Sequence, residues 1–205
     1  MLVTKTTERR SAVARQKLQV TVDALILAAQ RGMHEHGLDI TVDQIADLAE
    51  VSRRTVFRHF ASREDLLQAA IAARFADFFG SIPRYSGSDW QGWISDLTRL
   101  VHHTIADSGR LTWELRTRRL PPRLAAAYGE HRQALQLIFA TTTATLWEAA
   151  GGKGTPPDQL RQTVATHLSP LFTQTVLLDA DGTPELAAEL ATTAITATTR
   201  QLLGQ

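Results

Sequence analysis

The segment 41–63 holds the residues whose types and spacing point most clearly to a chemistry. Within it, Val56 and Phe60 are four residues apart, so in a helix both side chains face the same, inward side. The residues that are then left on the outward side include Arg53, Arg54 and Arg58. Because arginine forks pair with guanine edges and with phosphates, a short helix with this outward face suits the major groove of DNA.

Two helix starts position these residues. Thr41 can cap a first helix, and Gln44 follows three residues later, where its side chain can complete a capping box. Asp43 lies in the first turn, where the helix dipole favours a negative charge. After a short break at residues 50–51, Ser52 can cap a second helix. The pattern therefore predicts a helix-turn-helix whose second helix is presented to DNA.

The order and spacing of these residues resemble the TetR family of one-component transcriptional regulators. The resemblance runs from about residue 20 to residue 67, through H-G-L-D-I-T-V-D-Q-I-A, V-S-R-R-T-V-F-R-H-F and A-S-R-E-D-L-L. Two positions depart from the usual family pattern. Glu50 stands where the family commonly has glycine, and Phe57 stands where it usually has a tyrosine whose hydroxyl often touches a phosphate.

The expected DNA contacts come from the outward face of the second helix and from the helix starts around it. This set comprises Thr41, Ser52, Arg53, Arg54, Thr55, Phe57, Arg58, His59 and Arg63. The resemblance implies a phosphate contact for Arg63, because the family commonly has a lysine at that position.

Residues 1–17 contain five basic residues against one acidic residue, with Thr and Ser between them. This composition predicts a basic flexible arm. The arm is either a solvated tail or a segment that follows the phosphate backbone or the minor groove when DNA binds.

Composition limits the class of protein. At 205 residues and 43% hydrophobic content, the chain can bury a core in one domain plus a small appended one. The absence of cysteine excludes disulfide scaffolds and thiolate metal sites. Since no segment approaches the roughly 20 apolar residues of a membrane span, and the first residues lack a signal-peptide core, we expect a cytoplasmic protein without a membrane partner.

No motif predicts catalysis, a cofactor or a metal. His102 and His103 are adjacent, so in a helix they point about 100° apart and cannot form a metal pair spaced four residues apart. The stretch 151–155 resembles a phosphate loop only superficially, because the required earlier glycine and preceding strand are absent. The Ser, His and Asp residues show no recognisable catalytic spacing. We therefore expect neither an enzyme nor a metalloprotein.

Apolar residues recur at helical spacing along the chain, and no segment shows the alternation of apolar and polar residues that is typical of a strand. This pattern predicts an all-α fold of about nine helices. The expected organisation is an N-terminal three-helix DNA-binding domain at 18–62 and a C-terminal helical domain at 63–205 for ligand binding and dimerisation. The first helix is expected at about 18–36, and a fourth, capped by Ser62, ends by about Ile82. Later helices are expected near 90–108, 110–118, 122–150, 157–178 and 184–203, with a kink at Pro170.

The last two expected helices each carry a stripe of apolar and small residues. The stripes comprise Leu160, Val164, Leu168, Leu171 and Thr175 on one helix and Leu186, Leu190, Ala194 and Ala197 on the other. The resemblance implies that these helices pair across a twofold axis as a four-helix bundle, and the alternative is that the stripes form internal core. A homodimer would place two recognition helices roughly 34–36 Å apart on a near-palindromic, double-stranded operator.

The resemblance also implies a small-molecule effector in the middle helices. The candidate lining residues are Phe78, Trp93, Leu97, Trp113, His131, Leu135, Phe139 and Thr142. Each of them has the alternative of being ordinary core. A separate arginine cluster at 116, 118, 119 and 123 is either a solvated helix end or a site for an anionic ligand such as an acyl thioester.

Together, these features predict a homodimeric transcriptional repressor that a small-molecule ligand releases from its operator. Within regulators, the alternative is an activator or a ligand-independent regulator. From another class, the alternative is a small-molecule-binding protein or enzyme with a vestigial helix-turn-helix.

Overall fold

The computed structural model describes the backbone of residues 2–205 and the side chains from Gln16 onward. These residues form ten α-helices with one short 3-10 and one short π segment, and the described part of the chain contains no strand. The prediction of an all-α fold is confirmed. No helix within this part is long and apolar enough to span a bilayer.

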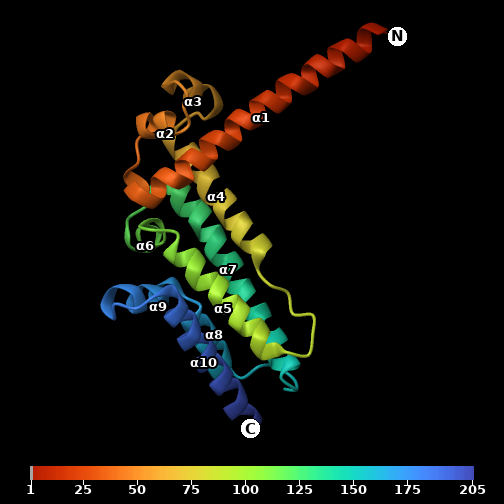
Figure 1. The fold of residues 1–205 in the computed structure, drawn as a ribbon, viewed down its shortest axis with the longest axis vertical. Helices are drawn as coiled ribbons and strands as arrows, with labels where there is room; N and C mark the ends of the chain where they lie inside the picture. The colour runs from red at the N-terminus through yellow and green to blue at the C-terminus, as the bar shows by residue number, and fades with distance from the viewer. Residues whose placement is uncertain (1) are drawn as a thin grey trace.

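The N-terminal head consists of α1 (Leu2–His36), η1 (Gly37–Asp39), α2 (Val42–Leu48) and α3 (Arg53–His59). Figure 1 shows α1 as one long helix, with α2 and α3 lying to one side of it. Leu25, Ala29 and Met33 on α1 are fully buried in a core that also contains Ile45 and Val56. The first helix therefore shares one buried core with α2 and α3.

The start of α1 differs from the sequence prediction. We expected a flexible arm over residues 1–17 and a helix from about residue 18, but α1 begins at Leu2. Residues 2–17 contain neither glycine nor proline, so nothing in the chain stops the helix from extending upstream. Met1 lies outside the described residues.

The body is formed by α4 (Arg63–Ser81), α5 (Trp90–Ala106), α6 (Leu111–Thr117) and α7 (Pro122–Ala149), which agree closely with expectation. The Ser62 hydroxyl caps α4 by accepting from the Asp65 amide at 3.1 Å. Leu66, Leu67 and Ala70 at the start of α4 are buried in the head core. One continuous helix therefore joins the head to the body (Figure 1).

The C-terminal part consists of α8 (Asp158–His167), α9 (Pro170–Gln174), the π segment η2 (Thr175–Asp179) and α10 (Pro184–Leu203). The single kinked helix expected at 157–178 is instead broken into separate pieces. Ser169 caps α9 and Pro170 occupies its first turn, because proline fits a helix start and disrupts a helix interior. This break raises the helix number above the expected nine.

A second core fills the space among α5, α7, α8 and α10. It contains Ile94, Leu97, Leu146 and Ile195, together with Leu160, Val164 and Leu168. The last three were expected at the dimer interface, but each is at most 3% exposed within one chain. Their stripe is internal core, which is the alternative that the sequence left open.

Candidate DNA-binding surface and ligand pocket

The two caps of the helix-turn-helix form as the sequence predicts. The Thr41 hydroxyl accepts from the Gln44 amide at 3.2 Å, and the Gln44 side-chain oxygen accepts from the Thr41 amide at 2.8 Å. The Ser52 hydroxyl accepts from the Thr55 amide at 3.1 Å. Thr41, Ser52 and Thr55 therefore fix the ends and angle of the two helices.

The turn between α2 and α3 places a non-glycine residue in the left-handed region. Glu50 has φ 55°, and the turn is closed by a hydrogen bond from the Val51 amide to the Ala46 carbonyl at 2.9 Å. This conformation costs an L-residue roughly 1–2 kcal/mol, which explains why glycine suits the position. The helix-turn-helix thus keeps its geometry in spite of Glu50.

The outward face of α3 is exposed while its inward face is buried. Val56 is 1% exposed and Phe57 is 43% exposed. Arg54 and Arg58 are also exposed, and among the residues from 16 onward neither forms an ion pair. Arg58 lies beside His59, with 3.3 Å between their Nη2 and Nε2 atoms.

Arg53 is held by neighbours within the chain. Its Nη1 donates to Asp43 Oδ2 at 2.7 Å, and its guanidinium lies 5.3 Å from the centre of the Phe57 ring. Both members of the ion pair are largely exposed, and exposed pairs contribute about 0–1 kcal/mol. Such a pair can be exchanged for a phosphate at little cost.

Arg63 does not extend toward the outward face of α3. Its Nε donates to the Ile40 carbonyl at 2.6 Å, and its Nη2 donates to the Leu38 carbonyl. Leu38 lies in η1 and Ile40 directly follows it, so the guanidinium satisfies carbonyls at the end of this short helix. The expected phosphate contact would require Arg63 to leave them.

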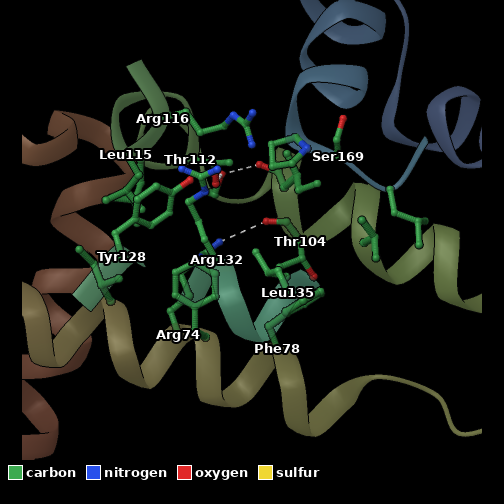
Figure 2. A pocket seen from close by; sticks show the side chains of 18 of the residues that line it. Arg74, Phe78, Thr104, Thr112, Leu115, Arg116, Tyr128, Arg132, Leu135 and Ser169 are labelled. Carbon is green, nitrogen blue, oxygen red and sulfur yellow. Dashed lines mark hydrogen bonds between the residues drawn. The ribbon is translucent and has the colours of Figure 1, made fainter. Parts of the chain in front are cut away.

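A cavity of about 290 Å³ opens between the body and the C-terminal part, bordered by α4, α5, α6, α7 and the α8–α9 junction. Figure 2 shows the side chains converging on it. Among the predicted lining residues, Phe78, Leu135 and Phe139 border the cavity. The rest of its apolar wall comprises Ile71, Phe75, Val101, Ile105, Leu111, Leu115, Ala165, Leu168 and Pro170.

The other predicted lining residues lie elsewhere. Trp93 donates from its indole nitrogen to the Pro83 carbonyl at 2.8 Å, and Leu97 and Thr142 are buried side chains that do not border the cavity. Trp113 is 46% exposed, and His131 stacks on Phe75 with 4.3 Å between ring centres. Helical spacing identifies inward positions, and it does not distinguish a cavity wall from filled core.

The sequence interpretation missed most of the polar lining. This lining comprises Arg74, Thr104, Ser108, Thr112, Arg116, Tyr128, Arg132, Gln136 and Ser169. Arg74 Nη2 donates to the Thr104 carbonyl at 3.3 Å, and burial lowers the pKa of the Arg74 guanidinium from its ordinary value. The available signal was an arginine among the inward apolar positions of α4.

The arginine cluster expected at 116–123 does not act as one site. Arg118 forms a two-pronged pair with Asp39, at 2.9 Å for each bond, and also contacts Glu114 at 3.2 Å. Arg123 pairs with Asp65 at 2.5 Å. Arg116 alone among the cluster borders the cavity.

One helix, α6, contacts both the cavity and the head. Its Leu111, Thr112, Leu115 and Arg116 line the cavity. On another side of α6, the carboxylate of Glu114 accepts from the Leu38 amide at 2.6 Å and is 5% exposed. Leu38 belongs to η1, which leads into the helix-turn-helix. A displacement of α6 would therefore reach the head directly.

The remaining predicted interface residues lie on the surface of one chain. Leu186 and Leu190 on α10 are 40% and 46% exposed, and Leu171 on α9 is 45% exposed. Thr175 and Ala197 are also exposed, and Ala194 is half-buried. Leu186, Leu190 and Ala197 follow helical spacing, so they form one continuous stripe along α10.

Comparison with known proteins identifies the family that the DNA-binding segment matches. Residues 25–70 match the sequence model of the bacterial regulatory proteins of the tetR family. Residues 25–70 therefore form a TetR-type DNA-binding segment. Over 71 residues it is 39% identical to the HTH-type transcriptional regulator TcmR of Streptomyces glaucescens, a stretch that covers 34% of this chain and 31% of TcmR. The match thus spans under a third of that relative.

Solved structures of transcriptional regulators share most of this fold. A TetR transcription regulator from Haloarcula marismortui superposes with a TM-score of 0.69 at 18% identity, covering 87% of this chain and 98% of that one. A protein from Saccharomonospora viridis in complex with choline gives 0.69 at 16%, covering 87% and 96%. FadR of Bacillus subtilis in complex with stearoyl-CoA gives 0.60 at 16%, covering 84% and 95%. The names of TcmR and of these three structures are those of transcriptional regulators.

Proposed function

We propose that this protein is a homodimeric, cytoplasmic repressor of the TetR family that binds a near-palindromic operator and is released from it by a small molecule in the α4–α7 cavity. The observation that carries the proposal is the position of α6. This helix supplies Arg116 and Thr112 to the cavity and holds the head through the bond from the Leu38 amide to Glu114.

DNA contact is assigned to the outward face of α3. Arg54, Phe57 and Arg58 are exposed there, and Arg53 is released from Asp43 at small cost. Thr55 and His59 flank this face, while Thr41 and Ser52 hold the helix ends with their hydroxyls. Phe57 packs against sugar or a thymine methyl in place of a hydroxyl contact.

Release by a ligand requires that α6 adopts two positions relative to the head, one that permits DNA binding and one that does not. A ligand shifts an equilibrium only by its differential affinity for the two states. The cavity is bordered by Arg116 on α6 and by Arg74 on α4, so a ligand that bridges these helices changes their spacing. Choline and stearoyl-CoA in two solved relatives support a small-molecule effector, and they differ in charge.

The test is DNA binding by the full chain at two salt concentrations, with Arg54→Ala as the variant. We expect salt-dependent binding, and we expect the variant to bind more weakly with a salt slope lower by about one. Arg99→Ala on α5 is the matched control, because Arg99 is exposed and lies outside the head. Binding that is absent, or that Arg54→Ala and Arg99→Ala affect equally, would contradict the assignment.

A second possibility is an activator or a ligand-independent regulator with the same DNA contacts. Transcription from a promoter that carries the bound site, measured with and without the protein, distinguishes a repressor from an activator. A third possibility is a small-molecule-binding protein with a vestigial helix-turn-helix, which the left-handed Glu50 and the internally bonded Arg63 favour. Ligand binding without any salt-dependent DNA binding would support that possibility.

A further inference from the structure

The cavity has two chemically different ends. Figure 2 shows Arg116, Arg132 and Tyr128 together toward α6, with Phe78 and Leu135 at the opposite side. The order along the helices agrees with this view. On α7, Arg132 precedes Phe139 by seven residues, about two helical turns, and both border the cavity. The cavity is therefore amphipathic, with its cationic end next to the helix that contacts the head.

The cationic end lacks a counter-charge from the protein. None of the cavity-lining residues is Asp or Glu. From residue 16 onward, the ion pairs within 4.0 Å include Arg53, Arg118 and Arg123 but none of the three cavity arginines. Asp107, just after α5, acts on Arg74 only at longer range. Arg74 is half-buried and its pKa is lowered by burial, whereas Arg116 and Arg132 border the cavity from exposed positions. Because none of these three guanidiniums has a paired carboxylate among the described side chains, this end of the cavity favours an anion.

We infer that the effector is an amphipathic anion, with a carboxylate or phosphate held by Arg74, Arg116 and Arg132 and a small apolar body against Phe78, Leu135 and Phe139. The inference rests on the proposed function in taking this cavity as the effector site. Guanidinium forks bind carboxylates and phosphates through paired hydrogen bonds. The volume of about 290 Å³ is at the lower end for ligand sites, so the body is small.

Matched probes with one apolar body and different head groups test the charge preference. The probes are 4-phenylbutyrate, 4-phenylbutyl phosphate, 4-phenylbutanol and 4-phenylbutylamine, titrated into the full chain by calorimetry. We expect each anion to bind at least about tenfold tighter than the alcohol, and the amine to bind most weakly. The ratio of the dissociation constants of the carboxylate and the phosphate probes then shows which of the two head groups the cavity prefers.

Substitutions locate the preference at the arginines. Arg74→Gln and Arg132→Gln should each weaken binding of the better anion by about tenfold and leave the alcohol nearly unchanged. Arg74→Lys keeps the charge and should recover part of the loss. Arg84→Gln, at an exposed position in the loop before α5, is the control and should have no effect. If Arg74→Gln does not fold, the exposed Arg132 still provides the test.

The inference fails if the alcohol or the amine binds as tightly as the anions, if no anion binds at millimolar concentration, or if the arginine variants lose nothing. DNA binding measured in parallel separates this failure from that of the proposed function. Release of DNA by a neutral or cationic compound would support the repressor proposal and would contradict the inference that the effector is an anion. Anion binding that requires the arginines but leaves DNA binding unchanged would support the anion preference of the cavity. It would contradict the proposal that the ligand releases the protein from DNA.

Discussion

Glu50 adopts a backbone conformation that is unfavourable for a residue with a side chain. With φ 55° it occupies the left-handed region, yet the flanking hydrogen bond from Val51 to Ala46 keeps the turn closed. We expect Glu50→Gly to raise the free energy of unfolding by about 1 kcal/mol, since glycine adopts this conformation without the side-chain clash. Urea unfolding measures the change. A variant that is equally or less stable would show that the turn is not strained.

His102 is a buried titratable residue on α5. It is 0% exposed, its Nδ1 lies 2.8 Å from the Thr173 hydroxyl, and burial lowers its pKa from 6.5 to about 4. The unfolded chain therefore binds a proton that the folded chain does not, between pH 6.5 and pH 4.

The stabilisation from neutral His102 is complete above about pH 6.5 and is lost as the pH falls toward 4. His102 contributes at most about 1.4 kcal/mol per pH unit to the slope of the unfolding free energy against pH. We expect unfolding free energies of the wild type to fall across this range, and those of His102→Gln to fall less steeply. Equal slopes for the two proteins would contradict the assignment.

At the scale of elements, caps and prolines could be predicted from the sequence because their chemistry is local. Thr41, Ser52 and Ser62 begin helices as expected, and Pro184 begins α10. The start of α1 could not be placed, because residues 2–17 contain no signal that begins a helix at residue 18. Pro170 was recognised as a disruption, but its outcome, a break with a new cap, depended on the packing around α8 and α9.

The site was less predictable than the elements. An inward aromatic residue has the same spacing in a filled core as in a cavity wall, which is why Phe78 and Phe139 were placed correctly and Trp93 was not. Arg132 could be assigned to the cavity only from the packing of α7 against α4 and α5. The ion pairs that divide the arginine cluster, such as Arg118 with Asp39, join residues far apart in the chain.

The contact of α6 with the head is expected to transmit the ligand response. Glu114→Gln removes the negative charge that accepts from the Leu38 amide and faces Arg110 and Arg118. We expect the variant to bind the effector with nearly unchanged affinity and to show several-fold weaker release from DNA, within the usual range of allosteric coupling.

Anisotropy titrations with and without effector measure this coupling. Glu148→Gln, an exposed carboxylate near the end of α7, is the control and should retain full release. Full release by Glu114→Gln would show that the response takes another route.

At the scale of the whole molecule, the proposal requires two copies. The exposed stripe on α10 includes Leu186 and Leu190, whereas Leu160, Val164 and Leu168 are unavailable because they fill the core. Leu190→Glu should convert the dimer to a monomer, since it buries a charge in an apolar interface. Sedimentation velocity measures the mass. Leu137→Glu, at an exposed leucine on α7, is the control and should remain dimeric. A dimeric Leu190→Glu variant would place the interface elsewhere.

The central claim is that two α3 helices bind one DNA site, and selection of bound duplexes from a random-sequence library by the full chain tests it most directly. We expect enrichment of a near-palindrome whose half-sites are about 10–10.5 base pairs apart, or a multiple of that spacing. The enrichment should be lost with Arg54→Ala. A pool that remains random, or that is equally enriched by wild type and variant, would contradict the account.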